Sequence, residues 1–149
     1  ASMAVMGGVP YLGAYTATKA AVVALSESWA GELEEKGIHV SVLCPAFVQT
    51  RIHESERNRP AKYQSGSAQR LDEGSFANST KQMVENGIEV SIVGKRVVEA
   101  LEDGEFYIFT HPNYHPVMQQ RNAAIDAAFI KSAESPLLQH IVNQKIEMP

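Results

Sequence analysis

A tyrosine and a lysine four positions apart, Tyr15 and Lys19 in the stretch GAYTATKAAV, are the side chains of this sequence best suited to chemistry. On a helix they would share one face, with about 5–6 Å between their Cβ atoms. A phenol is a weak acid, and a neighbouring ammonium favours its ionised form. The pair could therefore exchange a proton with a bound molecule near neutral pH. The spacing alone is common on helices, and a purely structural role is its ordinary explanation.

Two further features stand at fitting places along the chain. Ser2 precedes Tyr15, and the glycine-rich loop between them could fold back to place the serine hydroxyl beside the phenol. Downstream, the stretch CPAFVQT places Pro45 directly after a predicted strand and Thr50 shortly beyond it. The ends of such strands are where α/β proteins bind ligands.

The elements that must position these residues alternate between helix and strand. Residues from about 15 to 36 favour a helix that ends at Gly37, because apolar side chains recur at intervals of four. This recurring set is Ala17, Ala21, Leu25, Trp29 and Leu33. Further apolar positions widen the surface, which predicts burial against both a sheet and a partner helix.

The rest of the chain predicts a second helix–strand unit. Residues 38–44 (IHVSVLC) are typical of a strand, residues 91–103 of a helix and residues 106–109 of a short strand. A helical pattern covers about 116–132, and a short amphipathic helix is expected over about 137–146. Residues 1–14 contain too many glycines and prolines for a regular element and are expected to form a loop. Helices between strands predict a parallel sheet covered on both faces, to which two strands alone are too few.

Composition excludes several classes of function. The 149 residues are 44% hydrophobic, which suffices for a core. With 13 Lys and Arg against 17 Asp and Glu, the chain lacks the basic surface that nucleic acids require. One cysteine, Cys44, excludes an internal disulfide and fits a reducing, cytoplasmic setting. No stretch reaches the roughly 18 apolar residues of a membrane span, so no membrane partner is expected.

Taken together, the serine, the Tyr-x-x-x-Lys helix, the following strand and the Pro-x-x-x-x-Thr segment resemble the short-chain dehydrogenase/reductase family. The resemblance covers about residues 2–112. It implies an α/β fold of the Rossmann type, a doubly wound parallel sheet to which this chain supplies only the C-terminal part of a single domain. The chain begins with Ala1, without an initiator methionine or an N-terminal strand of its own, and we interpret it as a piece of a longer protein. The family's glycine-rich phosphate-binding turn lies upstream of its serine, so these residues made alone are expected to be inactive.

The resemblance also implies roles for individual residues. Tyr15 would exchange a proton with the alcohol or carbonyl oxygen of the substrate, Lys19 would assist it and hold the ribose of NAD or NADP, and Ser2 would orient the same oxygen. The implied reaction interconverts a secondary alcohol and a ketone by hydride transfer.

In the same way, the resemblance places Pro45, Val48 and Thr50 beside the nicotinamide, with Val48 offering backbone groups to its carboxamide. Ala46 stands where the family usually has glycine, and it lacks free access to a positive φ.

Residues 47–87 form a long polar excursion, which the resemblance identifies as a lid over the substrate. Apolar residues of this lid, together with Val9, Pro10 and Tyr11 of the early loop, predict a pocket for a bulky hydrophobic or aromatic alcohol or ketone. The lid residues concerned are Ile52, Tyr63, Leu71 and Phe76. The stretches SERNRP and YIFTHP resemble the bacterial branch that oxidises aryl alcohols at Cα. Residues from about 113 to 149 are expected to form a C-terminal helical extension.

Three further expectations complete the interpretation. A non-catalytic Rossmann-type binding or scaffold subunit, or an inactive fragment, is the alternative function. His111 and His115 are four apart, but Pro112 and Pro116 disfavour a helix that would present both to a metal, so no metal site is predicted. The broad apolar surface of the Tyr15 helix predicts a homo-oligomer, a dimer or a tetramer.

Overall fold

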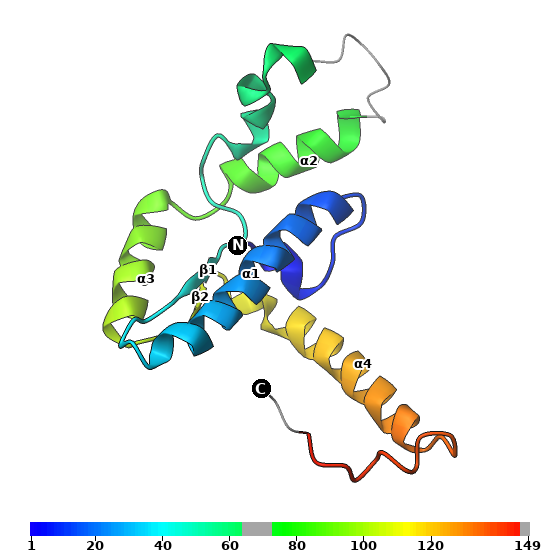
Figure 1. The fold of residues 1–149 in the computed structure, drawn as a ribbon. Coiled ribbons are helices and arrows are strands. Elements are labelled where there is room, and N and C mark those ends of the chain that lie inside the picture. Colours follow the sequence, from blue (N-terminus) through cyan, green and yellow to red (C-terminus); the bar gives the residue numbers. More distant parts are fainter. Residues whose placement is uncertain (64–72, 147–149) are drawn as a thin grey trace.

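The computed structural model describes residues 1–63 and 73–146, and it alternates helices with short parallel strands. Figure 1 shows α1 crossing in front of the strands, with α3 beside them and α4 extending away. The elements, with η for a 3₁₀ helix, are η1 (Met3–Met6), α1 (Gly13–Glu34), β1 (Val42–Cys44), η2 (Ile52–Asn58), η3 (Ala61–Tyr63), α2 (Glu73–Glu85), α3 (Val90–Glu102), β2 (Tyr107–Phe109), η4 (Pro112–Tyr114) and α4 (His115–Ala133).

The centre of the fold is the parallel pair of strands β1 and β2, in which Leu43 lies opposite Ile108. Successive side chains of a strand point to opposite faces. One face therefore carries Val42 and Cys44, and these residues join Met3 and Met6 of η1 in the buried core. The partly buried side chains that pack against this cluster include Val23 of α1, Phe109 of β2, and Tyr114 and Met118 beyond it. Ile108, on the other face, is 2% exposed on the strand that α3 contacts.

The first residues of the chain form backbone hydrogen bonds with the end of β1 and the residue that follows it. The amino group of Ala1 donates to the Leu43 carbonyl at 2.9 Å, and the Met3 amide donates to the Pro45 carbonyl, also at 2.9 Å. Partners that advance by two residues on each side are the pattern of a parallel ladder. Ser2 between them is fully extended (φ −167°, ψ 151°). The prediction that residues 1–14 form only a loop is therefore wrong for Met3–Met6, which form η1, whereas Ala1 and Ser2 belong to no strand.

The helix α1 has almost the predicted bounds, but it buries a different face. Leu25 and Trp29, on the predicted stripe, are each 47% exposed. The less exposed positions recur instead at intervals of three and four, and they are Thr16, Lys19, Val23, Ser26, Ala30 and Leu33. Several of these positions carry small side chains, which allow a helix to pack closely against its neighbours.

β1 is shorter than the predicted strand over residues 38–44, because its partner β2 offers only three residues. Ahead of the pair, the Ser41 hydroxyl donates to the Glu105 carbonyl and the Val42 amide to the Phe106 carbonyl. Strand pairing thus begins where the turn after α3 brings residues 105–106 beside residues 41–42.

At the C-terminal end, α4 agrees with the predicted helix, but the expected helix over 137–146 does not form. The amides of Leu138, Ile141 and Gln144 each donate to the carbonyl three residues earlier, which closes separate turns. Within the predicted lid, residues 73–85 form the regular helix α2. Leu71 and the side chain of Phe76, both assigned to the substrate pocket, lie outside the described residues.

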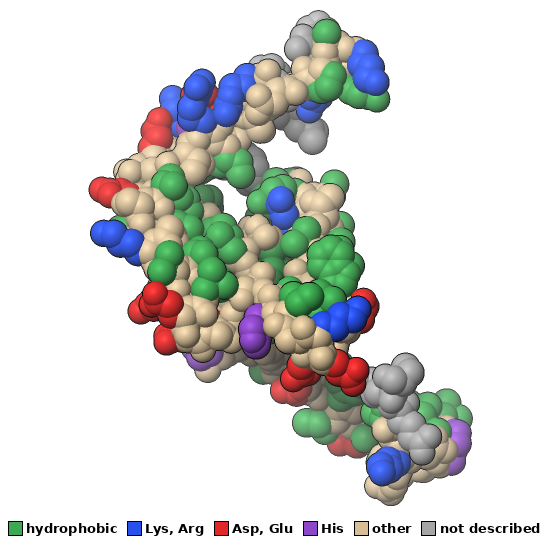
Figure 2. Space-filling view, turned by 60° about the vertical axis from the view of Figure 1, so that its left-hand side comes forward, with side chains coloured by type: hydrophobic (Ala, Val, Ile, Leu, Met, Phe, Trp, Pro, Cys, Tyr) green, Lys and Arg blue, Asp and Glu red, His purple; other side chains and the backbone are tan. Residues whose placement is uncertain are grey.

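Hydrophobic side chains gather over the middle of the face shown in Figure 2, and charged side chains lie mostly at its margins. On α1 the exposed apolar side chains include Val22, Leu25 and Trp29, and on α3 they include Ile92 and Val98. Within residues 1–63 and 73–146, no helix has the length and apolar character needed to cross a bilayer.

Candidate active site

Tyr15 and Lys19 lie one turn apart near the start of α1, and the structure brings their side chains together. The Lys19 ammonium nitrogen is 5.4 Å from the centroid of the Tyr15 ring, within the range of a cation–π contact. The Tyr15 side chain is 36% exposed, so its hydroxyl is not sealed in the core. The helix forms here because the Thr16 amide donates to the Leu12 carbonyl and the Thr18 hydroxyl to the Tyr15 carbonyl. The pair is available to a ligand.

Ser2 is held beside the end of β1 by its two neighbours in the chain. It lies between the two residues that bond to β1, and its hydroxyl oxygen accepts a hydrogen bond from the Ala4 amide at 3.2 Å, which caps η1. The residue is buried, at 9% exposure. Because η1 contacts α1, the segment that carries Ser2 adjoins the helix that carries Tyr15.

The segment after β1 holds Pro45, Val48 and Thr50, and other parts of the chain fix its path. The Met3 amide bonds to the Pro45 carbonyl on one side. On the other, the Ala46 amide donates to His111 Nδ1 at 3.4 Å, and the same nitrogen lies 2.7 Å from Thr110 Oγ1. These contacts anchor the start of the segment at the carboxyl ends of both strands.

Val48 forms a single parallel bridge with Ile88, which follows α2. The hydrogen bonds of this bridge join Ile88 to the two residues that flank Val48. The Ile88 amide donates to the Phe47 carbonyl at 3.1 Å, and the Gln49 amide donates to the Ile88 carbonyl at 2.9 Å. In a parallel ladder the residue between two such bonds directs its own N–H and C=O to the opposite side. Val48 therefore presents one donor and one acceptor away from Ile88, which is the complement of a primary carboxamide. The residues present fit a nicotinamide at this point.

Thr50 is exposed, and its hydroxyl oxygen accepts from the Ile52 amide at 3.4 Å ahead of η2. Ala46 needs no positive φ, since Tyr11 (φ 67°) is the non-glycine residue with positive φ in the described part of the chain. The replacement of the family's glycine is thus compatible with the local backbone.

Val9, Pro10 and Tyr11, the predicted substrate contacts, lie on the surface loop that leads into α1. Val9 is 37% exposed and Tyr11 is 92% exposed. These three residues do not line either of the two hollows described below.

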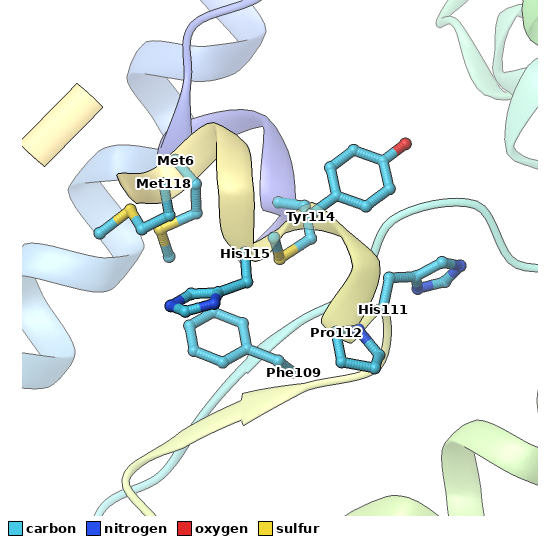
Figure 3. Close-up of a pocket in the computed structure, with 8 residues that line it drawn as sticks. Met6, Phe109, His111, Pro112, Tyr114, His115 and Met118 are labelled. Carbon is cyan, nitrogen blue, oxygen red and sulfur yellow. The ribbon is translucent and has the colours of Figure 1, made fainter. Parts of the chain in front are cut away.

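Sequence reasoning missed an apolar hollow of about 300 Å³ at the carboxyl end of β2. In Figure 3 the His115 ring lies beside Phe109 near Met118, while His111 projects on the other side of Pro112. His111 also lines a second, more polar hollow with Phe47 and Gly87. Neither hollow is lined by Ser2, Tyr15 or Lys19. The feature of the sequence that could have pointed to His111 is its position two residues after the end of β2. Its contact with Ala46 could not be predicted from a local pattern, because the two residues are 65 positions apart.

Cys44, at the end of β1, is fully buried beneath this region. Burial raises the pKa of its thiol, and this effect exceeds the opposing influence of the Ala1 amino group and of the Ser2 backbone. The neutral thiol packs as a small apolar side chain. Within the described residues, no group of three or more His, Cys, Asp or Glu side chains could hold a metal ion.

Parallel strands that alternate with helices define an α/β protein, in which ligands commonly bind at the carboxyl ends of the strands. A family model for short chain dehydrogenases matches residues 1–61. In fold, the chain matches a crystal structure of a short chain dehydrogenase/reductase from Burkholderia phymatum in complex with NAD. The TM-score is 0.77 and the identity 29%, over 99% of this chain and 50% of that one.

Two curated relatives agree with this assignment. A CLA biosynthesis dehydrogenase/reductase of Lactiplantibacillus plantarum is 33% identical over 126 residues, which are 81% of this chain and 44% of the relative. A C alpha-dehydrogenase of Sphingobium is 31% identical over 118 residues, which are 79% of this chain and 38% of the relative. The chain spans less than half the length of these relatives.

The chain is therefore similar to members of the short-chain dehydrogenase/reductase family over most of its length. It is similar to members that include a Cα-dehydrogenase, as the sequence predicted, and its fold is part of a Rossmann-type α/β fold.

Proposed function

We propose that the protein is an NAD- or NADP-dependent oxidoreductase that interconverts a secondary alcohol and a ketone. The observation that carries the proposal is the exposed Tyr15–Lys19 pair on α1, beside the η1 segment that begins after Ser2. A bound nicotinamide dinucleotide would accept or supply the hydride at the carbinol carbon.

The protein's own residues manage the oxygen and its proton. The Tyr15 hydroxyl takes the proton from the alcohol, or returns it to the carbonyl oxygen, while the Ser2 hydroxyl hydrogen-bonds to the same oxygen. The Lys19 ammonium stabilises the negative charge on the tyrosine oxygen as the proton leaves, and it also holds the ribose hydroxyls of the cofactor.

The cofactor would lie against the segment after β1. Val48 would bind the nicotinamide carboxamide through its N–H and C=O, with Pro45 and Thr50 lining the ring. Support comes from the directions that the Ile88 bridge imposes on the Val48 backbone, and from the related structure determined in complex with NAD.

We further propose a bulky hydrophobic or aromatic alcohol or ketone as substrate, with the loop of Val9, Pro10 and Tyr11 contacting it once the lid closes. Turnover of aryl ketones and aryl alcohols, with small polyols as the comparison, tests it. Turnover confined to the polyols would contradict it.

The decisive experiment is Tyr15→Phe in the protein at its natural length, with oxidation and reduction followed by the absorbance of the reduced nicotinamide. Turnover should fall by about 10²–10⁴-fold with the fold retained. The matched control is Tyr107→Phe, which removes a phenol that bonds to Glu27 away from Ser2 and Tyr15. It should lower stability and leave turnover in place. A natural-length protein that binds dinucleotide but turns over no alcohol or ketone would support a non-catalytic scaffold instead.

We also propose that the protein self-associates as a dimer or tetramer through the exposed apolar side of α1. Val22, Leu25 and Trp29 leave between 42% and 47% of their surfaces exposed in the described chain, and two-fold pairing is the commonest arrangement for such a surface. Light scattering at micromolar concentration should give at least twice the monomer mass for the natural-length protein. A monomer would contradict the proposal.

A further inference from the structure

Gly87 lies where the backbone that leaves α2 crosses the segment after β1. A Cβ atom at this position would stand 2.4 Å from the carbonyl oxygen of Phe47 and 2.9 Å from the amide nitrogen of Val48. Both are backbone atoms, which cannot turn aside as a flexible side chain can. Gly87 does not have a positive φ, so close approach rather than backbone conformation requires the glycine.

Hydrogen bonds hold the two segments together at this crossing. Besides the two bonds that Ile88 makes to Phe47 and Gln49, the Gln49 side-chain amide donates from Nε2 to the Gly87 carbonyl at 2.9 Å. We call residues 47–49 and 87–88 the Gly87 clasp. The Gly87 amide in turn donates to the carbonyl of Val84, which is 3% exposed, so the clasp is tied to the end of α2.

We propose that Gly87 is a positioning residue for the nicotinamide end of the cofactor. Its missing side chain lets the clasp close, and the closed clasp directs the N–H and C=O of Val48 to the side opposite Ile88. The inference rests on the proposed function, since it assumes that Val48 binds the carboxamide. It adds that the end of α2, which lies within the predicted lid, is joined directly to the proposed cofactor site where residues 87–88 cross residues 47–49.

The test compares two ligands in the natural-length protein with Gly87→Ala. The first is whichever of NAD and NADP binds more tightly to the unsubstituted protein. The second is the matching ADP-ribose, with or without the 2′-phosphate, which lacks the nicotinamide. Dissociation constants come from calorimetry. The substitution should weaken dinucleotide binding by about tenfold, as expected for roughly one lost hydrogen bond, and should change ADP-ribose binding by less than twofold.

Two further variants make the result specific. Gly94→Ala in α3 is the matched control, because a Cβ there meets no atom within 4 Å, and it should change neither affinity. Gln49→Ala removes the side-chain hydrogen bond to the Gly87 carbonyl without adding an atom. It therefore tests the positioning role if Gly87→Ala does not fold. It should weaken the dinucleotide by about threefold and spare ADP-ribose.

The outcomes separate the inference from the proposed function. Equal weakening of both ligands, or unchanged dinucleotide affinity in both clasp variants, would overturn the positioning role while the proposed function stands. Failure of the unsubstituted natural-length protein to bind either dinucleotide would overturn the proposed function, and the positioning role with it.

Discussion

The ammonium nitrogen of Lys19 stands 5.4 Å from the centre of the Tyr15 ring, one turn along α1. The two side chains are neither splayed apart nor enclosed, because Tyr15 keeps 36% of its surface exposed. This arrangement is compatible with the proton exchange that we propose for the pair.

Lys19→Met should lower kcat by about 10²-fold or more, because the variant keeps the chain length but removes the charge that stabilises the tyrosine oxygen. Steady-state kinetics with the natural-length protein measures it. Lys95→Met, on an exposed turn of α3, is the matched control and should behave like the unsubstituted protein. An unchanged kcat in Lys19→Met would contradict the assigned role.

Ser2→Ala should lower kcat by about 10²–10³-fold, the usual effect of losing a donor to a developing oxyanion. It also removes the cap that the Ser2 hydroxyl provides to the Ala4 amide, at a cost of about 1 kcal/mol. Kinetics and denaturant unfolding, measured together, separate the two effects. Ser28→Ala, which removes a surface bond to Glu32, is the control. A loss of stability without a loss of turnover would assign Ser2 to structure alone.

Gly7→Ala should destabilise the fold by about 1–3 kcal/mol, because a Cβ at Gly7 would lie 2.7 Å from the Val117 Cγ1 atom at the start of α4. Val117→Ala removes that atom and should restore most of the loss when the two substitutions are combined. Denaturant unfolding of both single variants and the double variant forms the thermodynamic cycle. Strictly additive effects would show that the two residues are not in contact.

Tyr107 should make stability depend on pH in the alkaline range. Its hydroxyl donates to the Glu27 carboxylate on α1, and this hydrogen bond, followed by burial, raises the pKa of Tyr107 to about 12. The stabilisation is complete below pH about 10, the ordinary value for a tyrosine, and is lost as the pH rises toward 12. Unfolding free energy should therefore fall between pH 10 and 12.

The matched variant for this dependence is Tyr107→Phe. It should lose roughly 0.5–1 kcal/mol at neutral pH, because the bond is partly exposed, and it should remove this part of the alkaline slope. The same slope in both proteins would assign the pH dependence to other groups.

Cys44 should resist thiol reagents in the folded protein, because it is fully buried and burial raises the pKa of its thiol. A colorimetric disulfide reagent should react with it slowly at neutral pH and promptly after denaturation. Rapid reaction without denaturant would show that β1 opens readily.

Relations between residues close in sequence could be predicted from local patterns alone. The Tyr15–Lys19 pair follows from the helical repeat, the α1 bounds from composition and Gly37, and β2 from a run of aromatic residues. The buried face of α1 could not be predicted in this way. Large apolar residues favoured the Leu25 and Trp29 side, whereas the helix approaches its neighbours with smaller residues such as Ser26.

By itself, the sequence determined that Tyr15 and Lys19 share one helix face, because spacing along a helix decides which side chains share a face. Only the tertiary structure decided that Ala1 and Met3 bond to Leu43 and Pro45, that the His111 ring accepts from the Ala46 amide, and that Gly87 lets two backbones approach closely beside Val48. Each of these contacts joins segments more than 35 residues apart. Such contacts depend on how whole elements pack, and no local pattern in the chain encodes that packing.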